Sequence, residues 1–177
     1  MKSNMLEKLL FVRINKESES RYDSLCELVI PYMRELDSHY PDVEPAPEEA
    51  IRNYTKSMVN NQGSADRYLE ICTLDGEPIG FYHAKVDHAE HKGYIKPGYG
   101  YVMEFYIVPR HRRKGFGALM FQRLCSLLAT HGVRQIYLTT DPVSGKPFWE
   151  RLGFVYKGEI SPDNEQEIYE VAINGTQ

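Results

Sequence analysis

Two glycines and a run of cations mark one junction of the sequence, the stretch EFYIVPRHRRKGFGALM at residues 104–120. Gly115 and Gly117 let the backbone turn tightly and approach a ligand without an intervening Cβ atom. Because a helix is expected to begin here, its first N–H groups lack intrahelical acceptors and, with the helix dipole, favour an anion. Three neighbouring side chains add positive charge: Arg112, Arg113 and Lys114. The segment predicts a pyrophosphate site, and a solvated basic turn is the alternative.

This segment differs from two common nucleotide-binding loops. It contains no Gly-Lys-Ser/Thr, which a Walker A loop requires, and GFGALM lacks the third glycine of the dinucleotide fingerprint. The six residues PRHRRK also stand between the predicted strand and the first glycine. The anion site is therefore predicted from the helix start and the charge, and not from either motif.

One carboxylate, Glu104, interrupts the apolar run YVMEFYIV at residues 101–108. Burial inside such a strand would raise the pKa of the carboxyl group towards the range that suits a general base. A glutamate at this place could equally pair with an arginine or lie at a bulge, since buried glutamates are often paired. The residues alone leave both interpretations open.

The elements that must position these residues follow from hydrophobic periodicity and from turn residues. Helical spacing covers residues 18–36, with Pro31 expected to kink or split that helix. Further helices are expected at 47–61, 117–131 and 146–153, and strands at 8–14, 67–74, 77–86, 101–108, 134–140, 154–160 and 167–173. The order β-α-α-β-β-β-α-β-α-β-β predicts helices covering a mixed sheet, an α/β or α+β fold in which 101–108 is a central strand.

Composition restricts the class of protein. The 177 residues suit one domain over 1–177, and 26% charged with 42% hydrophobic residues is typical of a soluble globular protein. Cys26, Cys72 and Cys125 form no CxxC pair, which fits a reducing compartment. The first 15 residues do not resemble a signal peptide, and no apolar stretch is long enough to span a bilayer. We therefore expect a cytoplasmic protein without membrane association.

Two motifs resemble those of one enzyme family. Arg112-x-x-Gly115-x-Gly117-Ala118 after FYIVP is similar to the acetyl-CoA signature R/Q-x-x-G-x-G/A of the GNAT N-acetyltransferase superfamily. FWERLGF, at residues 148–154, resembles the family's second signature, F-Y-E-K-L-G-F. The close match covers about residues 98–158, and the N-terminal half agrees in pattern only. The resemblance implies a mixed, mostly antiparallel sheet of about seven strands, flanked by helices.

The resemblance also implies acetyl-CoA as the acyl donor and no metal. Its pyrophosphate would bind the amides of Arg113 to Ala118, and its pantetheine would pair with the backbone near Ile107 and Val108, where two central strands splay apart. The implied cofactor-binding residues are Ile107, Val108, Arg112, Arg113, Lys114, Gly115, Phe116, Gly117, Ala118, Phe148 and Trp149.

For the chemistry, the resemblance implies direct attack of a primary amine on the thioester in a ternary complex, with Glu104 at the position of a general base. Trp149 replaces the tyrosine that frequently protonates the departing thiolate, and an indole N–H cannot act as an acid. Tyr106 or Tyr101 could serve instead, or the thiolate, with a pKa of about 8.5, leaves unassisted. The alternative is a CoA-binding or regulatory module that has lost turnover, for which Trp149 is the best argument.

The partners are less determined. An acidic stretch hints at a cationic amine or peptide acceptor, with a solvated loop as the alternative; its residues are Asp37, Asp42, Glu44, Glu48 and Glu49. His83, His88 and His91 stand near Asp87 and Glu90, but their spacing matches no compact zinc pattern, so a solvated polar loop is expected. The net charge of −4 argues against nucleic acid. A homodimer remains open.

Overall fold

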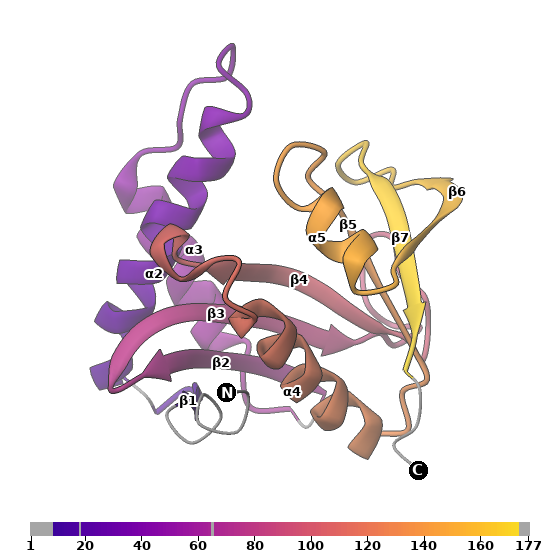
Figure 1. Cartoon of the computed structure of the whole chain (residues 1–177), viewed down its shortest axis with the longest axis horizontal. Helices are drawn as coiled ribbons and strands as arrows, with labels where there is room; N and C mark the ends of the chain where they lie inside the picture. Colours follow the sequence, from indigo (N-terminus) through magenta and orange to yellow (C-terminus); the bar gives the residue numbers. More distant parts are fainter. Residues whose placement is uncertain (1–8, 18, 65, 174–177) are drawn as a thin grey trace. The chain divides into compact units, whose positions relative to one another are not determined.

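The computed structural model describes residues 9–17, 19–64 and 66–173, and their elements follow the predicted order (Figure 1). Lys8, expected in the first strand, and Ser18, expected at the first helix start, lie outside these residues. The strands are β1 (Leu9–Arg13), β2 (Arg67–Leu74), β3 (Glu77–Val86), β4 (Gly100–Ile107), β5 (Gln135–Thr139), β6 (Val155–Ile160) and β7 (Glu167–Ala172). The helices are α2 (Glu19–Ser38), α3 (Glu48–Asn60), the 3₁₀ turn η1 (Pro109–His111), α4 (Phe116–Thr130) and α5 (Lys146–Arg151).

The strands form one seven-stranded sheet in the order β1-β2-β3-β4-β5-β7-β6. β1 pairs antiparallel with β2, and β7 pairs antiparallel with both β5 and β6. β4 and β5 are parallel neighbours, as expected for strands linked through a crossover helix. The predicted mixed, mostly antiparallel sheet and the central place of residues 101–108 are confirmed.

A two-residue turn joins β2 to β3. Asp75 and Gly76 have φ values of 51° and 85°, so both central residues occupy the left-handed region. That geometry matches the twist of an antiparallel hairpin, and Asp-Gly is among the sequences that adopt it most readily. Asp75 and Gly76 thus form the tight turn that this dipeptide favours.

Helix α2 continues through Pro31 from Glu19 to Ser38, so the expected split does not occur. α2 and α3 lie side by side in Figure 1, and the Tyr22 hydroxyl of α2 donates to the Arg52 carbonyl of α3 at 2.8 Å. Tertiary packing of this kind offsets the hydrogen bond that a proline removes from a helix interior.

The residues pack into two compact units, each made of two chain segments. The first contains Met1–His83 and Glu104–Gly117, and the second contains Ala84–Met103 and Ala118–Gln177. The predicted base and the cationic turn therefore belong to the first unit. The second signature, at residues 148–154, belongs to the second unit. One continuous domain over 1–177 remains a prediction.

In the second unit, α4 packs very closely against the start of β4. A Cβ atom placed on Gly100 would lie 2.8 Å from the Leu128 Cδ1 atom and 3.4 Å from the Ile136 side chain. Leu128 and Ile136 are fully buried. A Cβ atom here would force the buried Leu128 side chain to shift, so glycine at position 100 allows Leu128 of α4 to pack closely on the start of β4.

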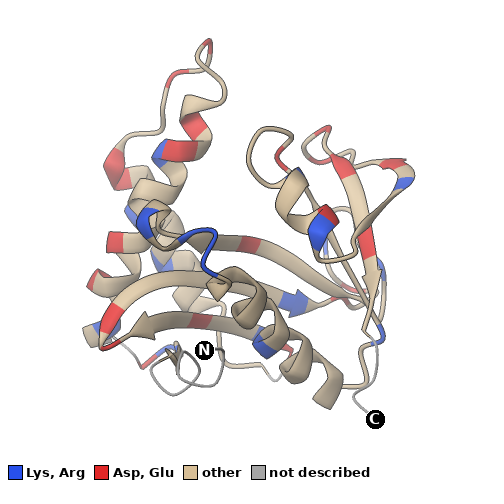
Figure 2. Ribbon diagram, viewed as in Figure 1, with Lys and Arg blue, Asp and Glu red and all other residues tan. Residues whose placement is uncertain are grey.

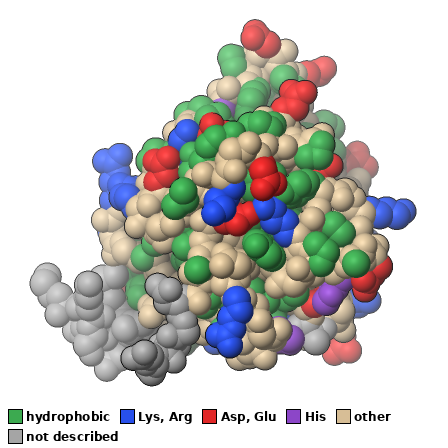
Figure 3. All heavy atoms as spheres, turned by 90° about the vertical axis from the view of Figure 1, so that its right-hand side faces the viewer, with side chains coloured by type: hydrophobic (Ala, Val, Ile, Leu, Met, Phe, Trp, Pro, Cys, Tyr) green, Lys and Arg blue, Asp and Glu red, His purple; other side chains and the backbone are tan. Residues whose placement is uncertain are grey.

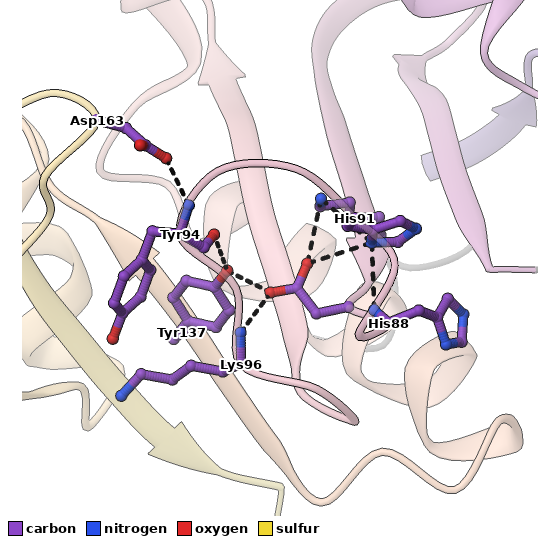
Figure 4. A network of polar contacts seen from close by, with 8 residues as sticks. His88, His91, Tyr94, Lys96, Tyr137 and Asp163 are labelled. Carbon is purple, nitrogen blue, oxygen red and sulfur yellow. Dashed lines mark hydrogen bonds and ion pairs between the residues drawn. The ribbon is translucent and has the colours of Figure 1, made fainter.

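The segment after β3 is organised by one buried carboxylate. The Tyr137 hydroxyl and the Lys96 amide both donate to one oxygen of the Asp87 carboxylate, the amide at 2.9 Å, and Figure 4 shows Tyr137 and Lys96 within this network. The Lys85 ammonium lies 3.2 Å and the His91 Nδ1 atom 3.7 Å from its other oxygen. Burial, together with Asp87, raises the pKa of Tyr137, so the phenol keeps its proton and donates it. The expectation of a solvated loop is wrong for Asp87, whose ion pairs and hydrogen bonds offset its desolvation.

The same segment is also held to the β6–β7 hairpin. The Tyr94 amide donates to Asp163 at 2.9 Å, and its hydroxyl donates to Glu159 at 2.5 Å. The Lys96 ammonium contacts Glu159 and Glu170. Residues 87–99 are therefore a connection that hydrogen bonds and ion pairs hold in place within the second unit.

Strand β6 is an edge strand with every residue exposed, including Val155 at 60% and Ile160 at 52%. Its pairing with β7 is irregular between Tyr156 and Ile160, and Gly158 has a φ of 78°. Irregular edges of this kind oppose unwanted strand pairing.

On the face that Figure 3 shows, hydrophobic side chains are interspersed with charges of both signs. Among the described residues, no helix has both the length and the apolar character that crossing a membrane requires.

Candidate active site

Two tyrosines hold the Glu104 carboxylate in the first unit. The Tyr32 hydroxyl, from α2, donates to Glu104 Oε2 at 2.5 Å, and the Tyr54 hydroxyl, from α3, donates to Oε1. Both carboxylate oxygens therefore accept a phenol hydrogen bond, and each bond comes from a different helix. The hypothesis that an arginine pairs with Glu104 does not describe this geometry.

The surroundings of Glu104 act on its protonation in opposite directions. Burial raises the pKa of the Glu104 carboxyl group, while the hydrogen bonds from Tyr32 and Tyr54 lower it, and the net result is a raised pKa. A carboxylate with a pKa closer to neutral accepts a proton more effectively at physiological pH. The environment of Glu104 therefore suits the general-base role that the sequence suggested.

An aromatic cluster surrounds this carboxylate. The Tyr32 ring lies 5.7 Å from the Phe81 ring and 5.4 Å from the Tyr106 ring, measured between centroids. Burial and the Glu35 carboxylate raise the pKa of Tyr106, and the Arg112 guanidinium lowers it less. Tyr106 is thus a protonated phenol and a weak acid, which does not favour it as the group that protonates a thiolate. The other phenol considered from sequence, Tyr101, stacks on Tyr137 at 4.6 Å in the second unit.

Arg112 is fixed in place. Its guanidinium forms a two-pronged ion pair with Glu35 of α2, at 2.9 and 2.6 Å, and its Nε donates to the Ile107 carbonyl at 2.8 Å. The guanidinium also lies 5.5 Å from the centre of the Tyr106 ring. Planar, bidentate pairs of this type give geometric specificity that a lysine could not. Arg112 therefore shapes the turn before α4, and much of its charge is already neutralised by Glu35.

The turn that follows has the backbone of an anion cradle. Arg113 has a φ of 59° and Gly115 a φ of 89°, so two left-handed residues stand just before α4. Positive φ is unusual for arginine and marks a backbone held by its surroundings. Arg113 and Lys114 are exposed, and the ribbon in Figure 2 is coloured as Lys or Arg between η1 and α4. The first amides of a helix, with cations beside them, suit a pyrophosphate.

The backbone at the end of β4 already has partners. The Val108 amide donates to the Ile79 carbonyl at 2.9 Å, and its carbonyl accepts from the His111 amide at 2.9 Å. On its other side, in the described chain, β4 pairs with β5 only at Gly100 and Tyr101. The splay of two central strands beyond this point stays a prediction. The Val108 amide is already used in its bond to Ile79, so a ligand at Val108 would hydrogen-bond to the second lone pair of the Val108 carbonyl oxygen.

Trp149 is a core residue of the second unit. It is buried, and the centroid of its ring lies 4.8 to 5.6 Å from the ring centroids of Phe148, Phe154 and Phe121. Phe121 belongs to α4, so this cluster joins α5 to α4. The structure does not place Phe148 and Trp149 relative to the cationic turn, and their contact with a cofactor stays a prediction.

We expect Trp149→Tyr to leave turnover nearly unchanged and to lower the free energy of unfolding by about 1–2 kcal/mol, because a smaller ring leaves a void among the neighbouring phenylalanines. Urea denaturation measures the loss of stability, and CoA release between pH 6 and 9 measures turnover. A large gain in turnover would instead show that a phenol at this position supplies a needed proton.

The remaining sequence candidates are accounted for by ordinary contacts. His83 lies inside β3, buried beside Gln62, and not in a solvated loop. Within the described residues, no three His, Cys, Asp or Glu side chains are arranged to hold a metal ion. Burial raises the pKa of the Cys72 thiol to about 12, which removes it as a nucleophile.

The acidic stretch between α2 and α3 is partly neutralised. Asp37 pairs with Arg34 at 3.3 Å, and Glu48 pairs with Arg52 at 2.9 Å, each within one helix. Glu48 and Glu49 occupy the first turn of α3, where negative charge complements the helix dipole. Local structure thus explains several of these acids without a ligand.

Sequence reasoning missed three residues of the site: Tyr32, Tyr54 and Glu35. Tyr32 and Glu35 are three positions apart on α2, so they share a helix face, and this spacing was visible in the sequence. Their partners were not visible, because Glu104 and Arg112 are about 70 residues further along the chain.

Comparison with known proteins agrees with this geometry. The family model for the acetyltransferase (GNAT) family matches residues 22–154, while no curated protein sequence matches the chain. Among solved structures, the paia N-acetyltransferase from Thermoplasma acidophilum, in complex with coenzyme A, is similar at 16% identity and a TM-score of 0.66, over 93% of this chain and 98% of that one.

Two further structures share the fold. An aminoglycoside 6'-acetyltransferase type Ii matches at 16% identity and a TM-score of 0.67, over 95% of this chain and 99% of that one. The ribosomal-protein-S18-alanine N-acetyltransferase from Escherichia coli matches at 14% identity and a TM-score of 0.59, over 96% of each chain. Since the family model spans most of the sequence and includes both the strand of Glu104 and the glycine turn, the chain belongs to the acetyltransferase (GNAT) family.

Proposed function

We propose that this protein transfers the acetyl group of acetyl-CoA to a primary amine. One observation carries the proposal: strand β4 holds a carboxylate of raised pKa, Glu104, and leads directly into a positive-φ turn with exposed cations at the start of α4. The first feature suits accepting a proton from an amine, and the second suits a pyrophosphate. One short segment thus provides both requirements of an acetyl-CoA-dependent transfer.

Different residues of the chain would bind the acetyl donor and accept the proton of the acceptor. The amides of Arg113 to Ala118 would bind the pyrophosphate, Arg113 and Lys114 would add charge, and acetyl-CoA supplies an activated thioester. Glu104 accepts a proton from the ammonium, directly or through water, so that the neutral nitrogen can attack the acetyl carbon. The new C–N bond forms, the attacking nitrogen releases its second proton to water, and the C–S bond breaks with the thiolate, whose pKa is about 8.5, as the leaving group. Protonated Glu104 then returns its proton to solvent.

The similar structures and one acidic stretch bear on the class of acceptor. The similar structures are named for acetylation of an aminoglycoside, which is a small molecule, and of an alanine of ribosomal protein S18. Asp42 and Glu44, between α2 and α3, add negative charge that would favour a cationic acceptor, either a small amine or a peptide. A cytoplasmic location and a homodimer remain predictions.

The competing proposal is a module that binds acetyl-CoA without turnover, and Trp149 in place of a tyrosine is the feature that favours it. A screen of small cationic amines and of peptide N-termini, with CoA release and product mass as readouts, separates the two. An acceptor whose mass rises by one acetyl group supports the enzyme. Acetyl-CoA binding with no modified acceptor in the whole screen supports the module.

A further inference from the structure

The two tyrosines on Glu104 come from separate helices and use both carboxylate oxygens. Tyr32 lies on α2 and Tyr54 on α3, and each donates its hydroxyl proton. A carboxylate bound at one oxygen can still rotate about its side-chain torsions, whereas one bound at both oxygens by fixed partners is held in a single orientation. Catalytic groups require this type of support to stay in productive geometry.

The tyrosines are themselves supported. The Tyr32 ring packs against the rings of Phe81 and Tyr106, and Tyr106 is in turn covered by the Arg112 guanidinium. The Arg112 guanidinium is fixed by Glu35, one helical turn after Tyr32 on α2. Tyr32 is therefore positioned by the same helix face that anchors the turn before α4.

We propose that Tyr32 and Tyr54 are positioning residues, which orient the Glu104 carboxylate and keep it available as a proton acceptor for the amine. The inference rests on the proposed function and extends it. Each phenol donates its hydroxyl hydrogen to the carboxylate. The phenol oxygens and the remaining carboxylate lone pairs can therefore act only as hydrogen-bond acceptors. Such a set recognises a donor, as an ammonium group is, and offers nothing to a ligand that only accepts.

The protonation of Glu104 provides the test. Burial favours the neutral acid, and the two hydrogen bonds favour the ionised form. Glu35 of α2 and Arg112 of the turn, the charged groups that act on the adjacent Tyr106, pair with each other. Removal of either phenol therefore leaves the desolvation in place while one opposing contribution is lost, so the pKa of Glu104 must rise further.

Tyr32→Phe and Tyr54→Phe each delete one hydroxyl and keep the ring. Because a hydrogen bond to a charged group is worth at least the free energy of one pH unit, we expect each variant to move the Glu104 titration midpoint upward by about one unit. The double variant should move it more. The midpoint is read by NMR on protein with ¹³C-labelled glutamate carboxyl groups, and Glu104→Gln assigns the signal.

This titration needs no turnover, so it distinguishes failure of the inference from failure of the proposed function. If an acceptor is found, the acid limb of kcat/KM should move upward in parallel with the NMR midpoint. The control is Tyr22→Phe, which deletes the hydroxyl that α2 donates to the Arg52 carbonyl. It should change neither readout.

An unchanged Glu104 midpoint in both folded single variants overturns the proposal. A loss of kcat that is uniform across pH, with an unmoved acid limb, also overturns it, because that result describes a structural role alone. Circular dichroism and thermal melting of each variant establish that the fold is retained.

Discussion

Glu104→Gln is expected to lower kcat by about 10² or more at neutral pH while the affinity for acetyl-CoA is retained. The amide keeps the shape of the side chain, but it cannot take a proton from the ammonium. One of the two phenols, Tyr32 or Tyr54, can still donate to the amide oxygen, and the other can turn its hydroxyl to accept from the amide NH₂, so the local packing should survive. Kinetics with an acceptor from the screen, together with calorimetric titration of acetyl-CoA, measure the two quantities.

The direction of the change in rate with pH provides a second test of the role of Glu104. Since burial raises the pKa of Glu104, the wild-type rate should fall as pH decreases through a value above the ordinary glutamate range, where the base becomes protonated. Glu104→Gln should lack that limb and should recover activity at high pH, where the amine deprotonates in solution. Glu77→Gln, at an exposed glutamate that pairs with Arg110, is the matched control. Full activity of Glu104→Gln at neutral pH would make Glu104 a structural residue.

Gly117→Val should weaken acetyl-CoA binding by 10-fold or more in a protein that remains folded, an effect of about 1.4 kcal/mol or larger. Gly117 is the second residue of α4, at the helix start where the amides are expected to face the pyrophosphate. A β-branched side chain there prevents the close approach that a bare backbone allows. Isothermal calorimetry with acetyl-CoA gives the dissociation constants.

The control for this prediction is Ser126→Val, which introduces the same side chain at an exposed position of the same helix. It should leave the dissociation constant within about twofold of the wild type, since it changes helix propensity without touching the turn. Equal affinities in Gly117→Val and wild type would refute the pyrophosphate assignment at this helix start.

Local signals in the sequence were sufficient for the elements and for one half of the site. Strand and helix order, the Asp75–Gly76 turn and the anion-favouring helix start all depend on residues within a few positions of one another. Glu104 stood out because a charge within an apolar strand is locally anomalous. The continuity of α2 through Pro31 without a split was not decided locally, because its contacts with α3, a separate element, contribute to its stability.

Long-range partners were decided only by tertiary structure. Nothing near Glu104 in the sequence indicates that phenols from two helices occupy its oxygens, or that Glu35 neutralises Arg112. Asp87 is a second example. It lies in a polar stretch of sequence typical of a solvated loop, yet it is buried and contacts Tyr137 and Lys85. Periodicity reports which face of an element is apolar, because that property repeats locally along the chain. Which polar groups meet depends on how separate elements pack, and this packing fixes the partners, the desolvation and the pKa values on which the chemistry depends.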